Sequence, residues 1–217
     1  MRLLEIWRYP VKTMAGEKLE RATLGPLGIE GDRIVHVEGA DGGVMTSRTH
    51  PRFLGHQGTL APDGTPLIDG RPWDGPEAAA TVVEIARPGA RLVRYEGVER
   101  FDVLPLLVAT DGAIAAFGHD LRRLRPNLVI GGVEGLAERD WPGGCLRIGE
   151  ALIGVQDLRV RCIMTSYDPD TQVQDRKITQ SIFQRFAGKL ALNCFVIEGG
   201  QIALGDEVHL VRGRACA

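Results

Sequence analysis

Short strand-like segments separated by turn residues make up most of this 217-residue sequence. Residues 33–38 lead into Gly39–Gly43 and then Val44, a pattern typical of a β-hairpin. Apolar residues recur at helical spacing in only two segments, 110–124 and 175–188. Because many short strands with few helices are typical of barrels, we predict a β-rich α+β fold: a β-barrel with a few short helices and attached elements.

Local patterns predict individual elements. Short apolar runs predict strands at 81–86 and 158–164. Strands 190–197 and 202–204 are expected to form a hairpin across residues 198–201. Both helical segments carry caps: Thr110 or Asp111 precedes the first, and the second begins near Asp175 and stops at Gly188.

Charge and hydropathy limit the classes of function. The formal net charge of −2 argues against a general nucleic-acid-binding protein, which usually has a strongly basic face. No apolar run approaches the length of a membrane span, and the N-terminus leads into strand-like sequence without a signal-peptide core. We therefore expect a cytoplasmic protein that binds neither nucleic acid nor membranes.

The four cysteines contain no C-x-x-C pair, which argues against a zinc ribbon or a thioredoxin-type site. In a reducing compartment we expect all of them to be free thiols: Cys145, Cys162, Cys194 and Cys216. Cys162 stands out because Arg161 precedes it and a polar turn soon follows. A neighbouring cation favours the thiolate, which binds soft metals or attacks electrophiles. The alternative is that Cys162 is a small buried core residue.

Three other segments carry groups suited to anions or polar rings. Lys12 and Thr13 follow the first strand, and a lysine with a hydroxyl suits a phosphate; a solvated loop lysine is the alternative. Arg33 follows a glycine-rich turn and is able to bind an anion in a bidentate manner, although such turns are common. Arg125 and Asn127 suit a planar polar ligand. The alternative is that Arg125 is a cation at the C-terminus of a helix and Asn127 is a turn residue.

The order of these motifs resembles that of the MOSC proteins, relatives of the molybdenum cofactor sulfurase C-terminal domain. The likeness is greater to the subgroup with an N-terminal MOSC β-barrel segment, which includes the mitochondrial amidoxime-reducing component. The matching motifs are Tyr9-Pro10-Val11-Lys12-Thr13, Gly31-Asp32-Arg33, Arg125-Pro126-Asn127 and Arg161-Cys162 with Asp168-Pro169-Asp170-Thr171. The resemblance implies an N-terminal segment at 1–97 and a MOSC domain at 98–217, with the first strands, about 1–34, packing into the MOSC barrel.

The resemblance also implies a cofactor site. Cys162 would be the protein ligand to molybdenum, and the other sulfurs would come from the pterin dithiolene. The residues implied to hold the pterin and its phosphate are Lys12, Thr13, Arg33, Arg125, Asn127 and Arg161. Asp168, Asp170 or Thr171 is expected to position substrate or relay protons, and a purely structural Asp-Pro-Asp turn is the alternative. Pyridoxal phosphate is not expected as a cofactor.

The implied activity is that of a molybdenum-dependent oxidoreductase that reduces N-hydroxylated compounds. A separate electron-donor protein is expected, because the sequence has no flavin, haem or iron–sulfur motif. Two alternatives remain: a non-enzymatic carrier of sulfur or cofactor on Cys162, and an interaction module in which Cys162 is buried. Val103, Leu104 and Val160 stand where relatives carry hydroxyl side chains, a departure that bears on cofactor affinity and substrate identity.

Overall fold

An eight-stranded mixed sheet dominates the structure, a computed structural model that describes residues 1–95, 97–213 and 216. Its strands are β1 (Arg2–Arg8), β2 (Glu17–Leu19), β11 (Leu106–Thr110), β12 (Leu128–Gly131), β13 (Cys145–Ile148), β14 (Ala151–Val160), β15 (Lys189–Glu198) and β17 (Val208–Val211). They lie in the order β17-β13-β14-β15-β11-β12-β1-β2. The described pairings are antiparallel except that of β11 with β12.

Three smaller sheets complete the β-structure. The first joins the two halves of the chain and contains β3 (Arg21–Gly25), β4 (Gly28–Ile29) and β16 (Gly200–Ala203). The second contains β5 (Val35–Glu38), β6 (Val44–Met45) and β10 (Arg91–Arg94). The third contains β7 (Gly58–Leu60), β8 (Pro66–Ile68) and β9 (Arg71–Pro72). The β-rich α+β prediction is confirmed, and so is the hairpin of β5 with β6.

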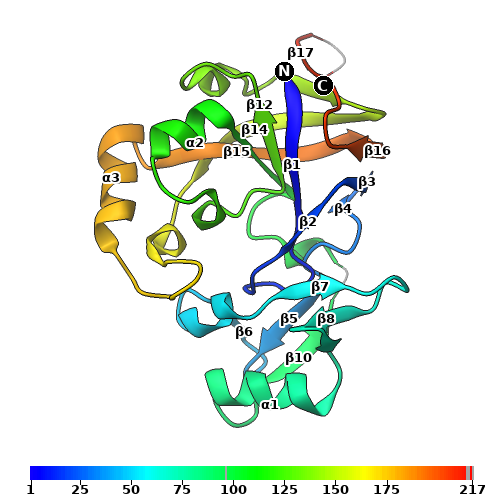
Figure 1. Cartoon of the computed structure of the whole chain (residues 1–217), viewed down its shortest axis with the longest axis vertical. Helices are drawn as coiled ribbons and strands as arrows, with labels where there is room; N and C mark the ends of the chain where they lie inside the picture. The colour runs from blue at the N-terminus through cyan, green and yellow to red at the C-terminus, as the bar shows by residue number, and fades with distance from the viewer. Residues whose placement is uncertain (96, 214–215, 217) are drawn as a thin grey trace.

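The chain forms two lobes, each with its own apolar core (Figure 1). The core of the larger lobe lies against the eight-stranded sheet and includes Leu3, Ile6 and Ile202. The core of the smaller lobe includes Phe53 and Val82. Strand β1 belongs to the large sheet although it begins the chain, because it pairs with β12. The division between residues 97 and 98 stays a prediction.

Three α-helices flank the sheets: α1 (Pro76–Ile85), α2 (Asp111–Phe117) and α3 (Arg176–Phe186). Short 3-10 turns are η1 (Pro51–Gly55), η2 (Val98–Arg100), η3 (Leu121–Arg123), η4 (Ala137–Asp140) and η5 (Ile163–Ser166). The predicted caps of α2 and α3 are confirmed, since the side chains of Thr110 and Asp175 accept backbone hydrogen bonds from Ala113 and Lys177. Left-handed Gly118 ends α2, so the second half of the predicted helix becomes η3.

The predicted strand at 81–86 is wrong, because this segment belongs to α1. Pro76 begins the helix, and Ala78 and Val82 are buried one turn apart on the same face. Strand 158–164 is too long: β14 ends at Val160. The chain then turns into η5, where the Ser166 hydroxyl donates to the Ile163 carbonyl.

The predicted hairpin across residues 198–201 is wrong as well. Within the described residues, β16 pairs with β3, and Ile202 is buried in the core of the larger lobe. The Gln201 side chain donates to the Thr23 hydroxyl at 2.7 Å, and its backbone N–H donates to Glu150. These contacts link segments far apart in sequence, so local turn residues do not indicate them.

The prediction of four free thiols is wrong, because Cys145 and Cys216 form a disulfide. Strand β13 pairs with β17 and places Cys145 opposite Val211, so the end of the chain returns to β13. Cys162 is free and exposed, and Cys194 is free and buried. Among the described residues, none of the helices has the length and apolar character needed to span a membrane.

Candidate functional site

Cys162 opens into a pocket that gathers residues from both halves of the chain. All six side chains predicted to hold a cofactor line this pocket with the thiol: Lys12, Thr13, Arg33, Arg125, Asn127 and Arg161. They come from segments up to 149 residues apart in sequence, from 12 to 161. The fold therefore brings together the residues that the sequence motifs singled out.

The pocket is strongly cationic. Among the described residues that line it, seven are arginine or lysine: Lys12, Arg33, Arg48, Arg123, Arg125, Arg159 and Arg161. Its acidic lining residue in the same set is Asp102. Such an excess of positive charge suits a ligand with more than one negative charge, such as a phosphate ester.

The thiol is presented at the point where β14 ends. Beyond Val160, the Arg161 N–H donates to the Gly188 carbonyl at 2.9 Å, and Cys162 stays extended before η5 begins. The N–H and the hydroxyl of Thr165 both donate to the Cys162 carbonyl, at 3.2 and 3.0 Å. The backbone of Cys162 is thus fixed while its sulfur remains exposed, as a metal ligand or nucleophile requires.

Arg161 is a buried cation with unused hydrogen-bond donors. Only 8% of the residue is exposed, and its Nη2 donates to the Leu124 carbonyl at 2.7 Å. Its Nε and Nη1 have no hydrogen-bond partner within the described part of the chain. Burial, assisted by nearby Arg159, lowers the Arg161 pKa to about 10, so the group stays charged at neutral pH. Buried donors without partners cost about 1–3 kcal/mol each, a cost that a bound anion would remove.

Tyr9 holds two of the pocket arginines. The guanidinium carbons of Arg125 and Arg33 lie 4.3 and 5.2 Å from the centre of its ring. The Tyr9 hydroxyl donates to the Pro126 carbonyl at 3.0 Å, and Arg125 Nη2 donates to the Met14 carbonyl at 2.7 Å. Burial raises the Tyr9 pKa, so the phenol is neutral and its ring serves as a cation–π support.

Asn127 occupies the pocket wall with its amide already bonded. Its Nδ2 donates to Asp32 at 3.2 Å, and its Oδ1 accepts from the Leu107 N–H at 3.1 Å. Asp32 is fully buried; it also accepts from the Tyr9 N–H at 2.7 Å and pairs with Arg33. This network ties the first strand to β11 and orients Arg33 toward the pocket.

Three residues of the predicted site have left-handed backbones. Thr13, Arg33 and Arg125 have φ values of 82°, 55° and 54°. This conformation costs non-glycine residues about 1–3 kcal/mol and persists where surrounding contacts hold it. At Thr13 those contacts are with Ser47, whose hydroxyl donates to the Thr13 carbonyl at 2.7 Å. Three residues of the pocket wall are thus held in a strained backbone conformation.

Sequence motifs missed several charged residues that line the same pocket, and Arg48 and Asp102 are two of them. Asp102 forms ion pairs with Lys12 at 3.0 Å, with Arg159 at 3.9 Å and with Arg48. Burial tends to raise the Asp102 pKa, but Lys12 and the two arginines outweigh it and lower that pKa. Both residues lie outside the recognised motifs, and no local pattern marks them.

Arg48 also lines the pocket together with Cys162. Burial alone would lower the Arg48 pKa, but the charge of Asp102 and the hydrogen bond with Cys162 outweigh it and raise that pKa. A guanidinium from the smaller lobe therefore shares the pocket with the thiol of the larger lobe. Arg159, which approaches the same group, lies two positions before Arg161, the spacing that places side chains on one face of a strand.

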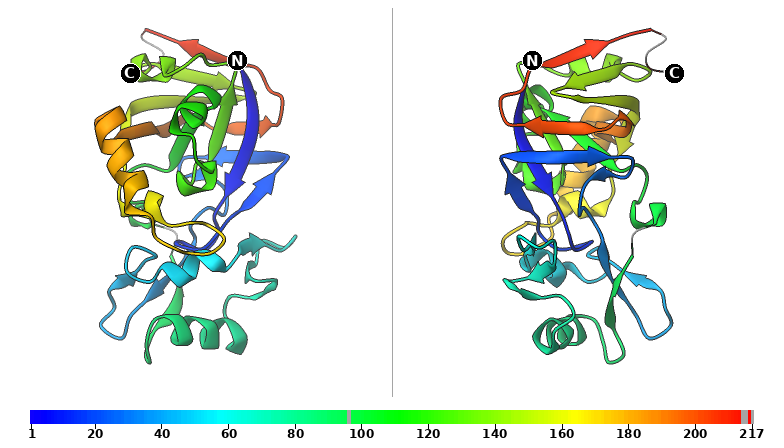
Figure 2. Two further views of the ribbon diagram at one scale, coloured as in Figure 1. Left: turned by 60° about the vertical axis from the view of Figure 1, so that its left-hand side comes forward. Right: turned by 90° about the vertical axis from the view of Figure 1, so that its right-hand side faces the viewer.

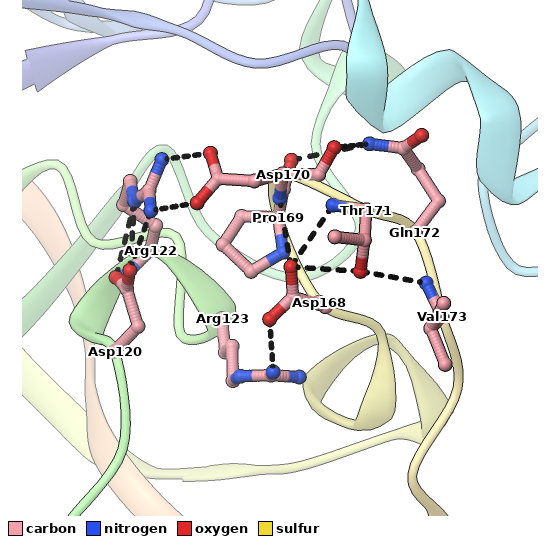
Figure 3. Close-up of polar contacts among 9 residues, drawn as sticks. All are labelled: Asp120, Arg122, Arg123, Asp168, Pro169, Asp170, Thr171, Gln172 and Val173. Atoms are coloured by element: carbon pink, nitrogen blue, oxygen red, sulfur yellow. Dashed lines mark hydrogen bonds and ion pairs between the residues drawn. The ribbon is translucent and has the colours of Figure 1, made fainter.

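The structure does not bring Asp168 and Asp170 into this pocket. Asp168 accepts from Arg123 Nη2 at 2.7 Å and from the Thr171 N–H at 2.9 Å (Figure 3). Asp170 accepts two hydrogen bonds from Arg122, at 2.8 and 2.7 Å (Figure 3). Both carboxylates fasten their turn to η3, and Figure 2 shows this yellow segment near the junction of the lobes.

Known proteins resemble the chain along nearly its full length. The profile of the MOSC N-terminal beta barrel domain matches residues 1–102, and that of the MOSC domain matches residues 111–209. Mitochondrial amidoxime-reducing component 1 from Mus musculus is 26% identical over 95% of this chain and 81% of its own length. The Homo sapiens protein of the same name is 27% identical, over 95% and 82%.

A solved structure has a similar fold. The YUAD protein from Bacillus subtilis superposes with a TM-score of 0.54 at 13% sequence identity. The superposition covers 98% of this chain and 96% of that chain.

Proposed function

The chain belongs to the MOSC family, and from this premise we propose that the pocket around Cys162 binds a molybdenum–pterin cofactor. One observation supports the proposal most strongly: an exposed thiol shares a pocket with seven cations and a single lining carboxylate among the described residues. A thiolate is a soft ligand suited to a sulfur-rich metal, and the cations suit the phosphate of the pterin. The donor set therefore fits the cofactor.

The roles of the individual residues follow from their contacts. Cys162 would bind the metal through its sulfur, with Arg48 in the wall of the same pocket. Arg33 and Arg125, held against Tyr9, would bind the pterin from one side. Thr13 and Asn127 would act as supports, because their polar side chains are already bonded within the protein.

The proposed reaction is the two-electron reduction of an N-hydroxylated compound such as an amidoxime. The N–O bond breaks, two electrons and two protons are consumed, and the oxygen leaves as water. The cofactor, when bound, would supply a metal that accepts the oxygen and cycles between two oxidation states. A separate electron-donor protein would supply the electrons. The names of the mouse and human relatives support this substrate class.

The protein would bind the cofactor and give the substrate access to it. The exposed sulfur keeps the site accessible to a small substrate. Val160 and Val103, both exposed, give the pocket an apolar rim next to the thiol. A role of Asp168 or Asp170 in positioning substrate stays a prediction, since neither lines this pocket.

The exposure of Cys162 also favours a second candidate, a carrier that holds sulfur or cofactor for a client enzyme. The same exposure argues against the third alternative, an interaction module in which Cys162 is buried. A carrier would contain sulfur that cyanide releases, together with less than stoichiometric molybdenum.

Reduction assays distinguish the two functions. Protein from a host that makes the cofactor is supplied with benzamidoxime and an artificial electron donor, and amidine formation is followed. We expect turnover by the wild type and none by Cys162→Ser, while the matched control Cys194→Ala keeps its activity. Cyanide-labile sulfur without amidine formation by the wild type would contradict the enzyme and support the carrier.

A further inference from the structure

Arg123 is a pocket cation that no motif singled out. It belongs to η3, lines the pocket of Cys162, and its side chain is only 10% exposed. Its Nη2 donates to Asp168 at 2.7 Å, whereas its Nη1 has no partner within the described part of the chain. The guanidinium is therefore held by one nitrogen and keeps another available.

Arg161 has the same arrangement. Its Nη2 donates to the carbonyl of Leu124, the residue next to Arg123, and its Nε and Nη1 are unused in the described structure. Arg161 is thus anchored to the residue that follows Arg123, and both arginines line a single pocket. Their unused donors distinguish them from Lys12, which already contacts Asp102 and the Arg100 carbonyl.

We propose that Arg123 and Arg161 together form the subsite for a phosphate monoester in this pocket. A phosphate monoester carries about two negative charges at neutral pH and offers several strong acceptors, which two guanidinium groups match. The inference rests on the proposed function, in which the phosphate is that of the pterin cofactor. Asp168 is then a positioning residue, because it orients Arg123 from the turn that follows Cys162.

Arg122 provides a natural comparison within the same turn of η3. It binds Asp120 and Asp170 through several hydrogen bonds, its side chain is 40% exposed, and it does not line the pocket. Figure 3 shows the two neighbouring arginines bound to different carboxylates of the same turn. Of these two neighbours, Arg123 alone combines a mostly buried side chain, a donor without a partner in the described residues and a position in the pocket wall.

Binding of phenyl phosphate to the cofactor-free protein tests the subsite, with affinity measured by calorimetry. We expect Arg123→Gln and Arg161→Gln each to weaken binding at least about tenfold, because a charge-assisted pair is lost. Arg122→Gln, the matched control, should bind within about twofold of wild type. Equal affinities for the wild type, Arg123→Gln and Arg122→Gln would overturn the proposal, as would undetectable binding by the folded wild type.

Asp168 variants test the positioning role. Asp168→Asn should weaken phenyl phosphate binding severalfold, Asp168→Glu should restore most of it, and Asp170→Asn should leave it unchanged. Circular dichroism and thermal melts confirm that each variant is folded. If Asp168→Asn and Asp170→Asn reduce affinity equally, the positioning role is wrong.

Failure of this inference is distinguishable from failure of the proposed function. If Arg123→Gln binds phenyl phosphate as tightly as the wild type, the proposed subsite is wrong, even if the wild type contains molybdenum. If phenyl phosphate affinity depends on Arg123 as expected but the protein never acquires molybdenum, the subsite is supported and the proposed function is wrong.

Discussion

Lys12 Nζ lies 3.0 Å from Asp102 Oδ1, so the lysine expected to contact a phosphate is already paired with a carboxylate of the protein. Asp102 also pairs with Arg48 and approaches Arg159. Asp102 thus forms ion pairs with three cations of a pocket that we propose binds an anion. A ligand that uses these cations must displace Asp102 or share them with it.

Asp102→Asn is expected to strengthen the binding of phosphate by the cofactor-free protein. The substitution removes the carboxylate that competes for Lys12 and Arg48 while it keeps the size of the side chain. Calorimetric titration with inorganic phosphate measures the change, and Asp63→Asn, at an exposed turn, serves as the control. Weaker binding in Asp102→Asn would mean that the carboxylate organises the cations rather than competing for them.

The stability of the fold should depend on Asp102 at acid pH. Its folded-state pKa is lowered, so its contribution is complete above the unfolded value of about 3.9 and is lost as pH falls through the lower folded value. Urea unfolding between pH 2 and 6 measures this. The difference in unfolding free energy between wild type and Asp102→Asn should shrink below about pH 4. A constant difference would contradict the ion pairs as its source.

Tyr9 variants separate the hydroxyl from the ring. Tyr9→Phe leaves the Pro126 carbonyl without its donor and should destabilise the protein by about 1–3 kcal/mol. Tyr9→Leu removes the ring under both Arg33 and Arg125 and should cost more, and it should also weaken phosphate binding. Urea denaturation measures the stabilities. Equal phosphate affinities in the two variants would show that the ring does not position the arginines.

The two free thiols should differ strongly in reactivity. Exposed Cys162 should react with iodoacetamide under native conditions, while buried Cys194, whose pKa burial raises, should react only after unfolding. Arg48→Gln should slow the Cys162 reaction severalfold, because it removes a cation from the pocket of the thiol and cations near a thiol promote its reaction. Mass spectrometry of timed digests measures both rates. An unchanged rate in Arg48→Gln would remove Arg48 from the thiol's environment.

Elements governed by local chemistry were predictable from the sequence. Helix α3 carries its own cap at Asp175 and its own buried face at Ile178, Ile182 and Phe186. Strand β16 was placed wrongly because its partner β3 precedes it by about 180 residues, and local turn residues do not specify such pairing. The Cys145–Cys216 disulfide depends in the same way on the pairing of β13 with β17.

The site was predictable to the extent that its residues lie in compact motifs. Arg161 and Cys162 are adjacent in sequence and stay together in the pocket. Arg48 and Asp102 come from irregular segments, and only the packing of the smaller lobe against the larger one gives them a role. Asp168 showed the converse, since it lies only six residues after Cys162 and does not line the pocket, although it binds Arg123, which does.

Molybdenum content is the most direct test of the thiol as a metal ligand. Wild type, Cys162→Ala and Cys194→Ala are purified from the same cofactor-producing host, and metal and pterin are measured per folded chain. We expect near-stoichiometric molybdenum in the wild type and in Cys194→Ala, and a large loss in Cys162→Ala. Equal molybdenum in all three proteins would contradict ligation by Cys162.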